Sequence, residues 1–244
     1  MDFTGQHILI TGASGGIGRA CALEFARRGG TVAIHYHENA DAARSTLMAL
    51  DNTGHTTIAA DLSDPAGVDT LIEHVVEVFG RIDVLINHAS VFEPHPPTQV
   101  NYADWCAAWT RTLATNLTGT ANVAYRTAQH MLGIGGGRII NISADAAFKG
   151  QADAPAYAVS KAGLNALGQS LALAYGPHNI YVYTIAAGTI APEAPMPIGK
   201  STPRSARPDA AADIARTAAF LASPGAEMLT GAIIDANRAA YLRS

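Results

Sequence analysis

The stretch that decides the fold is HILITGASGGIG, residues 7–18, in which a short apolar run passes into a glycine-rich turn. His7–Ile10 has the length and apolar character of a buried strand, and Ala20–Arg28 continues with helical period. Glycines allow a tight turn and a close approach of the backbone to a diphosphate, while a helix N-terminus offers free amide donors. The order strand, glycine turn, helix therefore predicts a dinucleotide site.

The rest of the chain repeats this alternation of short apolar runs and longer helical segments. Runs that are apolar throughout indicate parallel strands buried on both faces, because parallel strands need crossover helices. We therefore expect an α/β fold, a doubly wound Rossmann-type domain over residues 1–244 with a mainly parallel seven-stranded sheet flanked by helices. The further expected strands are Thr31–Tyr36, Thr56–Ala60, Ile82–Ile86, Arg138–Ile142, Ile180–Ile185 and Ala232–Ile234, and the expected helices are Ala40–Leu50, Gly67–Phe79, Asp104–Leu132, Pro155–Tyr175 and Asp209–Leu221.

Composition excludes several classes of partner. The net charge of −4 gives no basic surface for nucleic acid or an anionic membrane, and a small neutral or anionic metabolite remains as substrate. Cys21 and Cys106 show no metal-binding spacing, so we expect no metal and a reducing compartment, the cytoplasm. No apolar run is long enough for a membrane span, and nothing directs export. The proline-rich stretch Ala191–Pro208 predicts either a mobile flap or a rigid connector.

Motifs along nearly the whole chain resemble the short-chain dehydrogenase/reductase family, especially its 3-oxoacyl-carrier-protein reductases. The resemblance implies an NAD(P)(H)-dependent oxidoreductase that moves a hydride between nicotinamide and a carbonyl or alcohol carbon of a small metabolite. The motifs are Thr11-Gly12 with Gly16 and Gly18, Asp61-Leu62, Asn87-His88-Ala89-Ser90, Asn116, and Tyr157-Ala158-Val159-Ser160-Lys161.

The coenzyme residues are implied by this resemblance. Asp61 would bond the adenine amino group and Leu62 would offer its amide to the ring, although Asp61 could instead cap the next helix, a task that Asp64 fits better. Tyr36 stands where NAD-users carry Asp, and His37 stands where NADP-users often carry Arg, which favours NADP and leaves NAD open. Glu38 and Ser14 weaken that preference, and His37 could simply be a polar strand-end residue. The expected coenzyme contacts are Gly12, Ser14, Gly16, Ile17, Gly18, Tyr36, His37, Asp61, Leu62, Asn87, Ala89, Tyr157, Lys161, Gly188 and Thr189.

Tyr157 and Lys161 lie four residues apart, on one face of a predicted helix. A phenol with a pKa of about 10 is a poor base near neutrality, and a nearby ammonium would lower that pKa. The resemblance gives Tyr157 the acid/base role, has Lys161 hold the nicotinamide ribose, and has Asn116 order a water beside the lysine.

The family's substrate-orienting serine falls on Ala144, whose methyl group cannot donate a hydrogen bond. Either Ser143 or Asp145 could take its place, or both could bond local backbone. Loss of one oriented donor typically costs on the order of a hundredfold in rate. Low activity on simple ketones is therefore expected.

Two other functions remain open from the sequence. His35-Tyr36-His37 and Ala89-Ser90-Val91-Phe92 resemble pteridine reductases, in which an aromatic side chain at Phe92 would stack on a pterin whose C=N bond is reduced. Gly16, where those enzymes usually carry Arg, argues against it, and Phe92 could instead be an apolar plug. Alternatively, Ala144, Ala187 and the ending Asp235-Ala236-Asn237 could mark a nucleotide-binding protein with impaired turnover.

The resemblance also implies a homodimer or homotetramer formed through the two long helices. Leu164, Leu167, Leu171 and Leu173 are compatible with that interface, as they are with packing on the parent sheet. Trp105 and Trp109 share a helix face and predict core or subunit packing. The sequence leaves the substrate and its stereochemistry undetermined.

Overall fold

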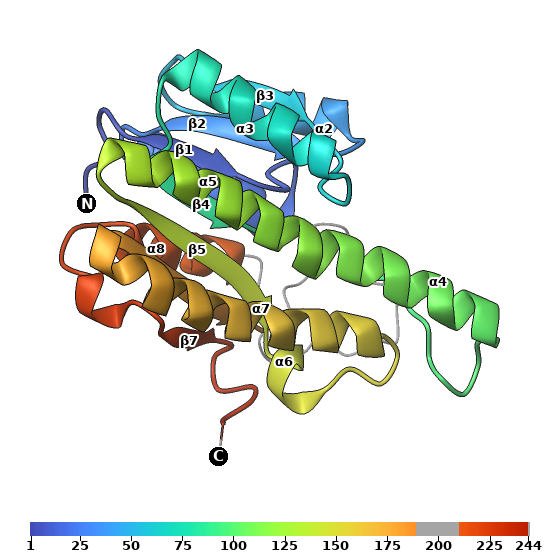
Figure 1. Ribbon diagram of the computed structural model, residues 1–244. Helices are drawn as coiled ribbons and strands as arrows, with labels where there is room; N and C mark the ends of the chain where they lie inside the picture. Colours follow the sequence, from blue (N-terminus) through green and yellow to red (C-terminus); the bar gives the residue numbers. More distant parts are fainter. Residues whose placement is uncertain (189–209, 244) are drawn as a thin grey trace.

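A computed structural model describes residues 1–188 and 210–243 of the chain. Seven parallel strands form one sheet in the order β3-β2-β1-β4-β5-β6-β7 (Figure 1). The order reverses direction between β1 and β4, which confirms the doubly wound sheet predicted from the sequence. The strands are β1 (His7–Ile10), β2 (Thr31–Tyr36), β3 (Thr56–Ala59), β4 (Val84–Asn87), β5 (Gly137–Ala144), β6 (Ile180–Ala187) and β7 (Ile233–Ala236).

Helices cover both faces of the sheet. Ile8 and Ile10 of β1 pack with α1 and α8 on one face, whereas Leu9 packs with α3 and α5 on the other. This alternation explains why the central strands are apolar throughout. The helices are α1 (Gly16–Arg27), α2 (Ala40–Met48), α3 (Pro65–Phe79), α4 (Tyr102–Leu113), α5 (Thr120–Ile134), α6 (Ala146–Lys149), α7 (Pro155–Tyr175) and α8 (Ala210–Leu221).

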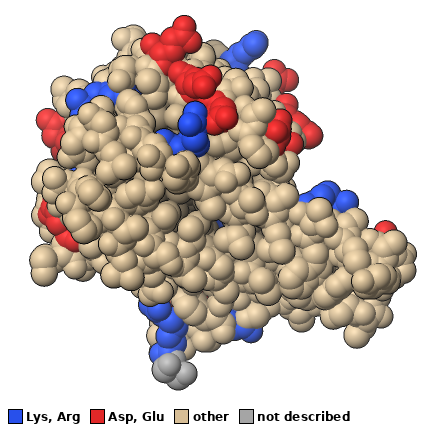
Figure 2. Space-filling view, viewed as in Figure 1, with Lys and Arg blue, Asp and Glu red and all other residues tan. Residues whose placement is uncertain are grey.

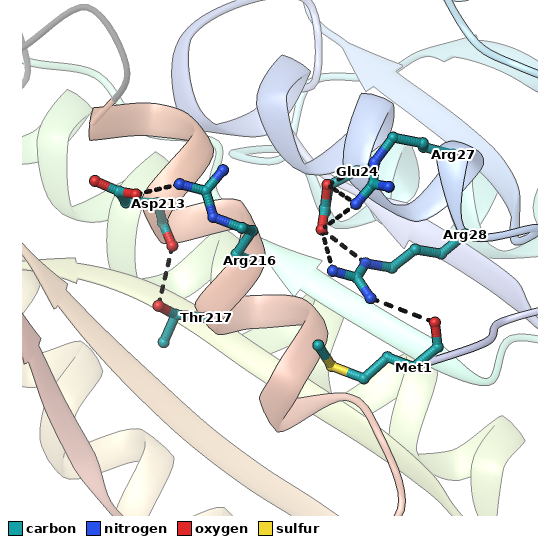
Figure 3. A network of polar contacts seen from close by, with 7 residues as sticks. All are labelled: Met1, Glu24, Arg27, Arg28, Asp213, Arg216 and Thr217. Atoms are coloured by element: carbon teal, nitrogen blue, oxygen red, sulfur yellow. Dashed lines mark hydrogen bonds and ion pairs between the residues drawn. The ribbon is translucent and has the colours of Figure 1, made fainter.

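Helices α1 and α8 pack against each other, and each carries polar contacts beside this interface (Figure 3). Glu24 of α1 accepts hydrogen bonds from Arg27 and Arg28, and Arg28 also reaches the carbonyl of Met1 at 3.3 Å. On α8, Asp213 pairs with Arg216. These contacts are mostly exposed, so they contribute little beside the apolar contact between the helices.

The helix expected over Asp104–Leu132 is interrupted, which corrects the sequence prediction. Between α4 and α5 the chain widens into the π-helical segment η1 (Ala114–Gly119). A Cβ on Gly119 would lie 2.3 Å from the carbonyl oxygen of Leu62, so the helix passes over that backbone at a distance only glycine permits. Gly119 is the one local signal at this point, and an isolated glycine is tolerated inside a helical pattern. The widened turn carries Asn116, whose side chain bonds Val91 after β4 and Ser160 of α7.

Other expectations differ from the structure in detail. Helix α1 begins at Gly16, four residues before the predicted Ala20, because the glycine turn feeds directly into the helix. Leu173 is 83% exposed whereas Leu164 is buried, so the predicted leucine stripe does not form one continuous face. The stretch Ala191–Pro208 lies outside the described residues. Of the helices in the two described stretches, none combines the length and apolar character that crossing a membrane requires.

Candidate active site

A cavity of ≈ 390 Å³ lies at the carboxyl ends of the central strands. Gly16 and Ile17 of α1 line one end of it, and Tyr157 and Lys161 of α7 line the other. Gly188, which follows β6, also contributes to the wall. The structure thus brings the predicted dinucleotide turn and the predicted acid/base pair to one space, at the sheet edge where open α/β folds bind ligands.

The glycine turn leaves room for a bound group. Gly12 and Gly16 have φ values of +67° and +55°, in the left-handed region that favours glycine. A Cβ on Gly12 would lie 2.8 Å from Cα of Ala89, whereas one on Gly15 or Gly16 would meet open space. Helix α1 begins without a side-chain cap and without an acidic residue in its first turn. Its first amides and its dipole can therefore hold an anion, and this cradle fits the diphosphate of a nicotinamide dinucleotide.

The segment after β4 packs against the same turn. Oγ1 of Thr11 accepts hydrogen bonds from the amides of His88 and Ala89 at 3.0 and 3.1 Å. Asn87 instead turns its side chain inward and donates to Oδ1 of Asn141 at 3.0 Å. The backbone of Ala89 is thus held against the glycine turn by Thr11, while the Asn87 side chain joins β4 to β5.

At the end of β2, His37 lies between two carboxylates. Its ring nitrogens are 3.8 Å from Glu38 and 4.0 Å from Asp61. Asp61 accepts hydrogen bonds from the amide and hydroxyl of Ser63, which lower the pKa of its carboxyl. Asp64 accepts from Ala66 at 3.0 Å and caps α3, as the sequence suggested. Leu62 is buried, and Thr189 lies outside the described residues.

Tyr157 and Lys161 share a face of α7, but they are not hydrogen-bonded to each other. Nζ of Lys161 lies 5.6 Å from the centre of the Tyr157 ring and donates to the carbonyl of Ile142 at 2.9 Å. Burial raises the pKa of Tyr157 to about 12, with a further contribution from Asp145, and lowers the pKa of Lys161 to about 8. The expected lowering of the tyrosine pKa by the ammonium is therefore wrong for this chain. Desolvation of the phenolate outweighs the distant charge.

The side chain of Asn116 holds the segment after β4 against α7. Its Oδ1 accepts from the amide of Val91 at 2.7 Å, and its Nδ2 donates to the Val91 carbonyl and to Oγ of Ser160. The side chain is buried and fully engaged by protein groups. Its water-ordering role stays a prediction.

Ser143 and Asp145, the two candidates for the missing serine, lie differently. Oγ of Ser143 donates to the backbone carbonyl of Lys161 at 3.1 Å and is directed at α7. Asp145 is 5% exposed and lines the cavity, where its Oδ2 accepts from Nζ of Lys149 at 2.8 Å. Both residues line the cavity, but the Ser143 hydroxyl is bonded to a distant carbonyl on α7 rather than to local backbone, whereas the Asp145 carboxylate is left as the acidic group facing the site.

Phe92 stands beside the acid/base pair. Its ring is half exposed, lines the cavity and meets Tyr157 edge to face at 5.1 Å between ring centres. The aromatic position noted in the sequence thus faces the reacting groups.

Sequence reasoning missed His95. This residue is 2% exposed, and its Nε2 accepts a hydrogen bond from the amide of Ala156 at 3.1 Å. Its Nδ1 therefore carries the proton and donates to the carbonyl of Glu93 at 2.7 Å. Helix α7 has no side-chain cap from Ala154, so His95 caps it from another part of the chain. In the sequence, the one signal of a cap from elsewhere in the chain was that Ala154, just before Pro155, has no side chain that could cap the helix.

Trp105 and Trp109 share a face of α4, as the sequence predicted, and both are partly buried. The rings of Trp105 and Trp109 are 5.5 Å apart, and Trp105 also meets the His95 ring edge to face. Within residues 1–188 and 210–243, no group of three His, Cys, Asp or Glu side chains is arranged to hold a metal ion.

Comparisons with known proteins agree with this geometry. Residues 6–202 match the family model described as short chain dehydrogenase. The chain is 34% identical over 250 residues to cis-4-hydroxycyclohexanecarboxylate dehydrogenase of Sinomonas cyclohexanicum, with 95% of each chain covered. It is 35% identical over 246 residues to D-threitol dehydrogenase of Mycolicibacterium smegmatis, covering 95% of this chain and 92% of that one. A solved structure assigned as a short-chain alcohol dehydrogenase from Sinorhizobium meliloti 1021 superposes with a TM-score of 0.86 at 28% identity, covering 97% and 96% of the two chains.

Proposed function

The chain belongs to the short chain dehydrogenase family, and from its site we propose that it transfers a hydride at an alcohol or carbonyl carbon of a small metabolite with Tyr157 as acid/base. Members of this family use nicotinamide coenzymes, and the finer part of the proposal is that NADP(H) is preferred here. The observation that carries the proposal is the shared cavity, since one space joins the uncapped start of α1 to Tyr157 and Lys161.

When bound, the coenzyme supplies or takes up the hydride at C4 of its nicotinamide. The chain's part is to hold it and to move a proton. With a pKa of about 12, the Tyr157 phenol stays protonated near neutrality and is ready to donate to a carbonyl oxygen. In the reverse direction it must first lose that proton, so oxidation should speed up with rising pH. Lys161, fixed through the carbonyl of Ile142, holds its buried ammonium 5.6 Å from the centre of the phenol ring.

Asp145 takes the place beside the substrate that a serine hydroxyl would occupy. An ionised carboxylate only accepts hydrogen bonds, so it suits a substrate that carries a hydroxyl or N–H donor near the reacting carbon. A plain ketone has no hydrogen to donate to the Asp145 carboxylate. Its oxygen also lacks a second hydrogen-bond donor beside Tyr157. We expect such ketones to react on the order of a hundredfold more slowly than substrates of the first kind.

The preference for NADP(H) rests on the end of β2. Tyr36 offers no carboxylate to bind a ribose diol or to repel a 2′-phosphate. His37, which directly follows β2, is flanked by Glu38 and Asp61. These carboxylates oppose a phosphate, so the preference should be modest. Comparison of kcat/KM with NADPH and NADH measures it, and a preference for NADH would overturn it.

A pteridine reductase-like reduction of a ring C=N bond is the second candidate, favoured by the half-exposed Phe92 ring against Tyr157. A flat heterocycle could stack there with an N–H directed at Asp145. Tight competitive inhibition by a diaminopteridine would favour this reaction, and turnover of acetoacetyl thioesters would count against it. NADPH binding without turnover of a broad carbonyl and imine panel would indicate a nucleotide-binding protein instead.

Assembly and location are also proposals. We take residues 1–244 as one domain of a cytoplasmic homodimer or homotetramer. Helix α4 extends past the body of the molecule (Figure 1), and this arm shows few charged side chains in Figure 2. Tyr102 is 81% exposed on it. An arm with few charges suits pairing with a second copy, and the mass in solution by light scattering tests it.

Tyr157→Phe tests the proposed function. It removes the transferred proton and little else, so turnover should fall at least about a thousandfold while NADPH still binds. Asn165→Ala, on the same helix and away from the cavity lining, is the control for changes in α7. Wild-type turnover by the phenylalanine variant would disprove the mechanism.

A further inference from the structure

Two histidines hold both backbone polar groups of Gly12, the first glycine of the turn. The amide of Gly12 donates to Nδ1 of His35 at 3.1 Å, and its carbonyl lies 3.1 Å from Nδ1 of His88. His35 comes from β2 and His88 follows β4, so the two rings approach from strands on either side of β1. The main chain of His35 also accepts the amide of Ala13 at 2.9 Å. Together these bonds fix the peptide at which β1 turns toward α1.

The hydrogen bonds determine where each ring carries its proton. Nε2 of His35 lies 3.0 Å from the carbonyl of Ala60, which can only accept, so the proton is on Nε2 and Nδ1 is free to accept from Gly12. Nδ1 of His88 faces the carbonyl of Gly12 and must therefore donate. Both rings are neutral, and they use opposite tautomers.

The turn is closed tightly on the His88 ring. A Cβ on Gly12 would lie 3.1 Å from Nδ1 of His88, and one on Gly18 would lie 2.7 Å from the same atom. The ring thus fills the space that these two glycines leave. The amides of Gly12 and Ala13 both donate to His35. The amides left to bind a ligand are therefore those near Gly15 and Gly16, which face open space.

We propose that His35 and His88 are positioning residues that clamp Gly12 and thereby set the shape of the turn for the coenzyme diphosphate. The inference rests on the proposed function, which places the diphosphate at this turn. It predicts that coenzyme affinity depends on both rings. His35 acts from outside the cavity lining, whereas the His88 ring also forms part of the cavity wall.

The clamp should weaken in acid, chiefly through His35. Protonation of His35 would put an N–H on Nδ1 facing the N–H of Gly12 and break that bond. His35 is buried, which lowers its pKa; His37 on its own strand adds to this, whereas Asp61 after β3 opposes it. Burial and the charge of Lys161 on α7 lower the pKa of His88 to about 4. Protonation of His88 on Nε2 would leave its bond to Gly12 in place.

The test is titration of purified full-length variants with NADPH, followed by fluorescence. His35→Leu and His88→Leu remove the clamp, and each should raise the Kd for NADPH about tenfold, the effect of losing one buried hydrogen bond. His88→Asn keeps an N–H directed at Gly12 and should stay within about threefold of wild type. His178→Ala, an exposed histidine at the far end of α7, is the matched control. At saturating NADPH the leucine variants should retain most of their kcat.

Folded leucine variants that bind NADPH as tightly as wild type would overturn the proposal. If they fail to fold, the pH dependence of NADH binding decides, since NADH lacks the titrating 2′-phosphate. The Kd of wild type should rise toward acid pH more steeply than that of His35→Gln, whose amide accepts from Gly12 without titrating. Equal pH dependence in the two proteins would overturn the clamp. If wild type binds neither NADPH nor NADH, the proposed function itself fails, and the clamp with it.

Discussion

Replacing His95 with leucine should both destabilise the protein and slow its reaction. The variant leaves the amide of Ala156 without the acceptor that now lies 3.1 Å away in a buried position. Leaving a buried donor unsatisfied costs about 1–3 kcal/mol, and losing a helix cap typically costs about 1 kcal/mol. Both figures refer to the same hydrogen bond, so they are counted once. The edge-to-face contact with Trp105 adds about 0.5–1.5 kcal/mol. We therefore expect the free energy of unfolding to fall by about 2–4 kcal/mol.

The effect on rate follows from the position of the cap. Ala156 immediately precedes Tyr157, so loosening the first turn of α7 moves the phenol relative to Phe92 and Asp145. A displacement of about 1 Å at a reacting group can cost on the order of a hundredfold in rate. We expect kcat to fall at least tenfold. The Kd for NADPH should change less, because the glycine turn proposed to hold the diphosphate is elsewhere and α7 is expected to contact the coenzyme only through Tyr157 and Lys161.

Urea denaturation followed by circular dichroism measures the stability, and steady-state kinetics at saturating NADPH measures the rate. His95→Gln retains an acceptor for Ala156 and should recover most of both losses. Trp105→Leu removes the ring contact but keeps the cap, so it should lose stability with little change in kcat. The reasoning would be refuted if His95→Leu unfolded at the wild-type urea midpoint, or if it lost stability and kept the wild-type kcat.

Three further predictions concern charge near the site. Asp145→Asn removes a negative charge that raises the pKa of Tyr157, so the pH midpoint for alcohol oxidation should move to lower pH by up to about one unit. Lys149→Met removes the cation that pairs with Asp145, so it should move the midpoint to higher pH. An unchanged midpoint in both variants would show that Asp145 does not act on the phenol. The pKa of Lys161 is about 8, so its ammonium should lose a proton above that pH and the affinity for coenzyme should decline in wild type. Lys161→Arg keeps its charge and should show no such decline. Titration of both proteins with NADPH at pH 7 and pH 9.5 measures the difference. His88 has a folded pKa of about 4, below its unfolded value of about 6.5, so the unfolded chain gains the proton first. Stability should therefore fall as the pH drops from about 6.5 to 4, by at most about 3 kcal/mol, and urea midpoints of His88→Asn should show a shallower fall.

Local patterns were sufficient to predict the sheet and the glycine turn. The apolar runs at His7–Ile10 and Ile82–Ile86 predicted the strands β1 and β4. The glycine turn predicted the helix that follows it, although α1 begins at Gly16, inside the turn. For the strands and the turn, the signal lies within one element or between chain neighbours. Tyr157 and Lys161 needed the family motifs along the chain as well as their spacing, because that spacing is common on helices.

The rest depended on contacts between distant segments. The π-helical segment ends at Gly119, where the helix passes close to the backbone of Leu62, and no pattern in the helix itself reveals that contact. The direction of the Tyr157 pKa shift depends on how deeply the phenol is buried, and charge alone suggested the opposite sign. Ser143 could be separated from Asp145 only once the backbone of α7 was seen to receive the serine hydroxyl. Each of these is a tertiary property of residues that look ordinary in sequence.

The two helices that meet at the cavity start in contrasting ways, and this contrast decides which of them can receive the coenzyme phosphates. Neither the Gly15 cap of α1 nor the Ala154 cap of α7 offers a side-chain acceptor. On α7 the deficit is filled by His95, and the amide of Tyr157 is taken by the carbonyl of Ala154, so its first turn has no donors to spare. On α1 the bonds to the histidines stop at Ala13, before the helix begins, and leave the amides beside Gly15 and Gly16 open. An anion is therefore drawn to α1 alone, which directs the diphosphate to one end of the cavity and leaves the other end, at Tyr157, for the reacting carbon.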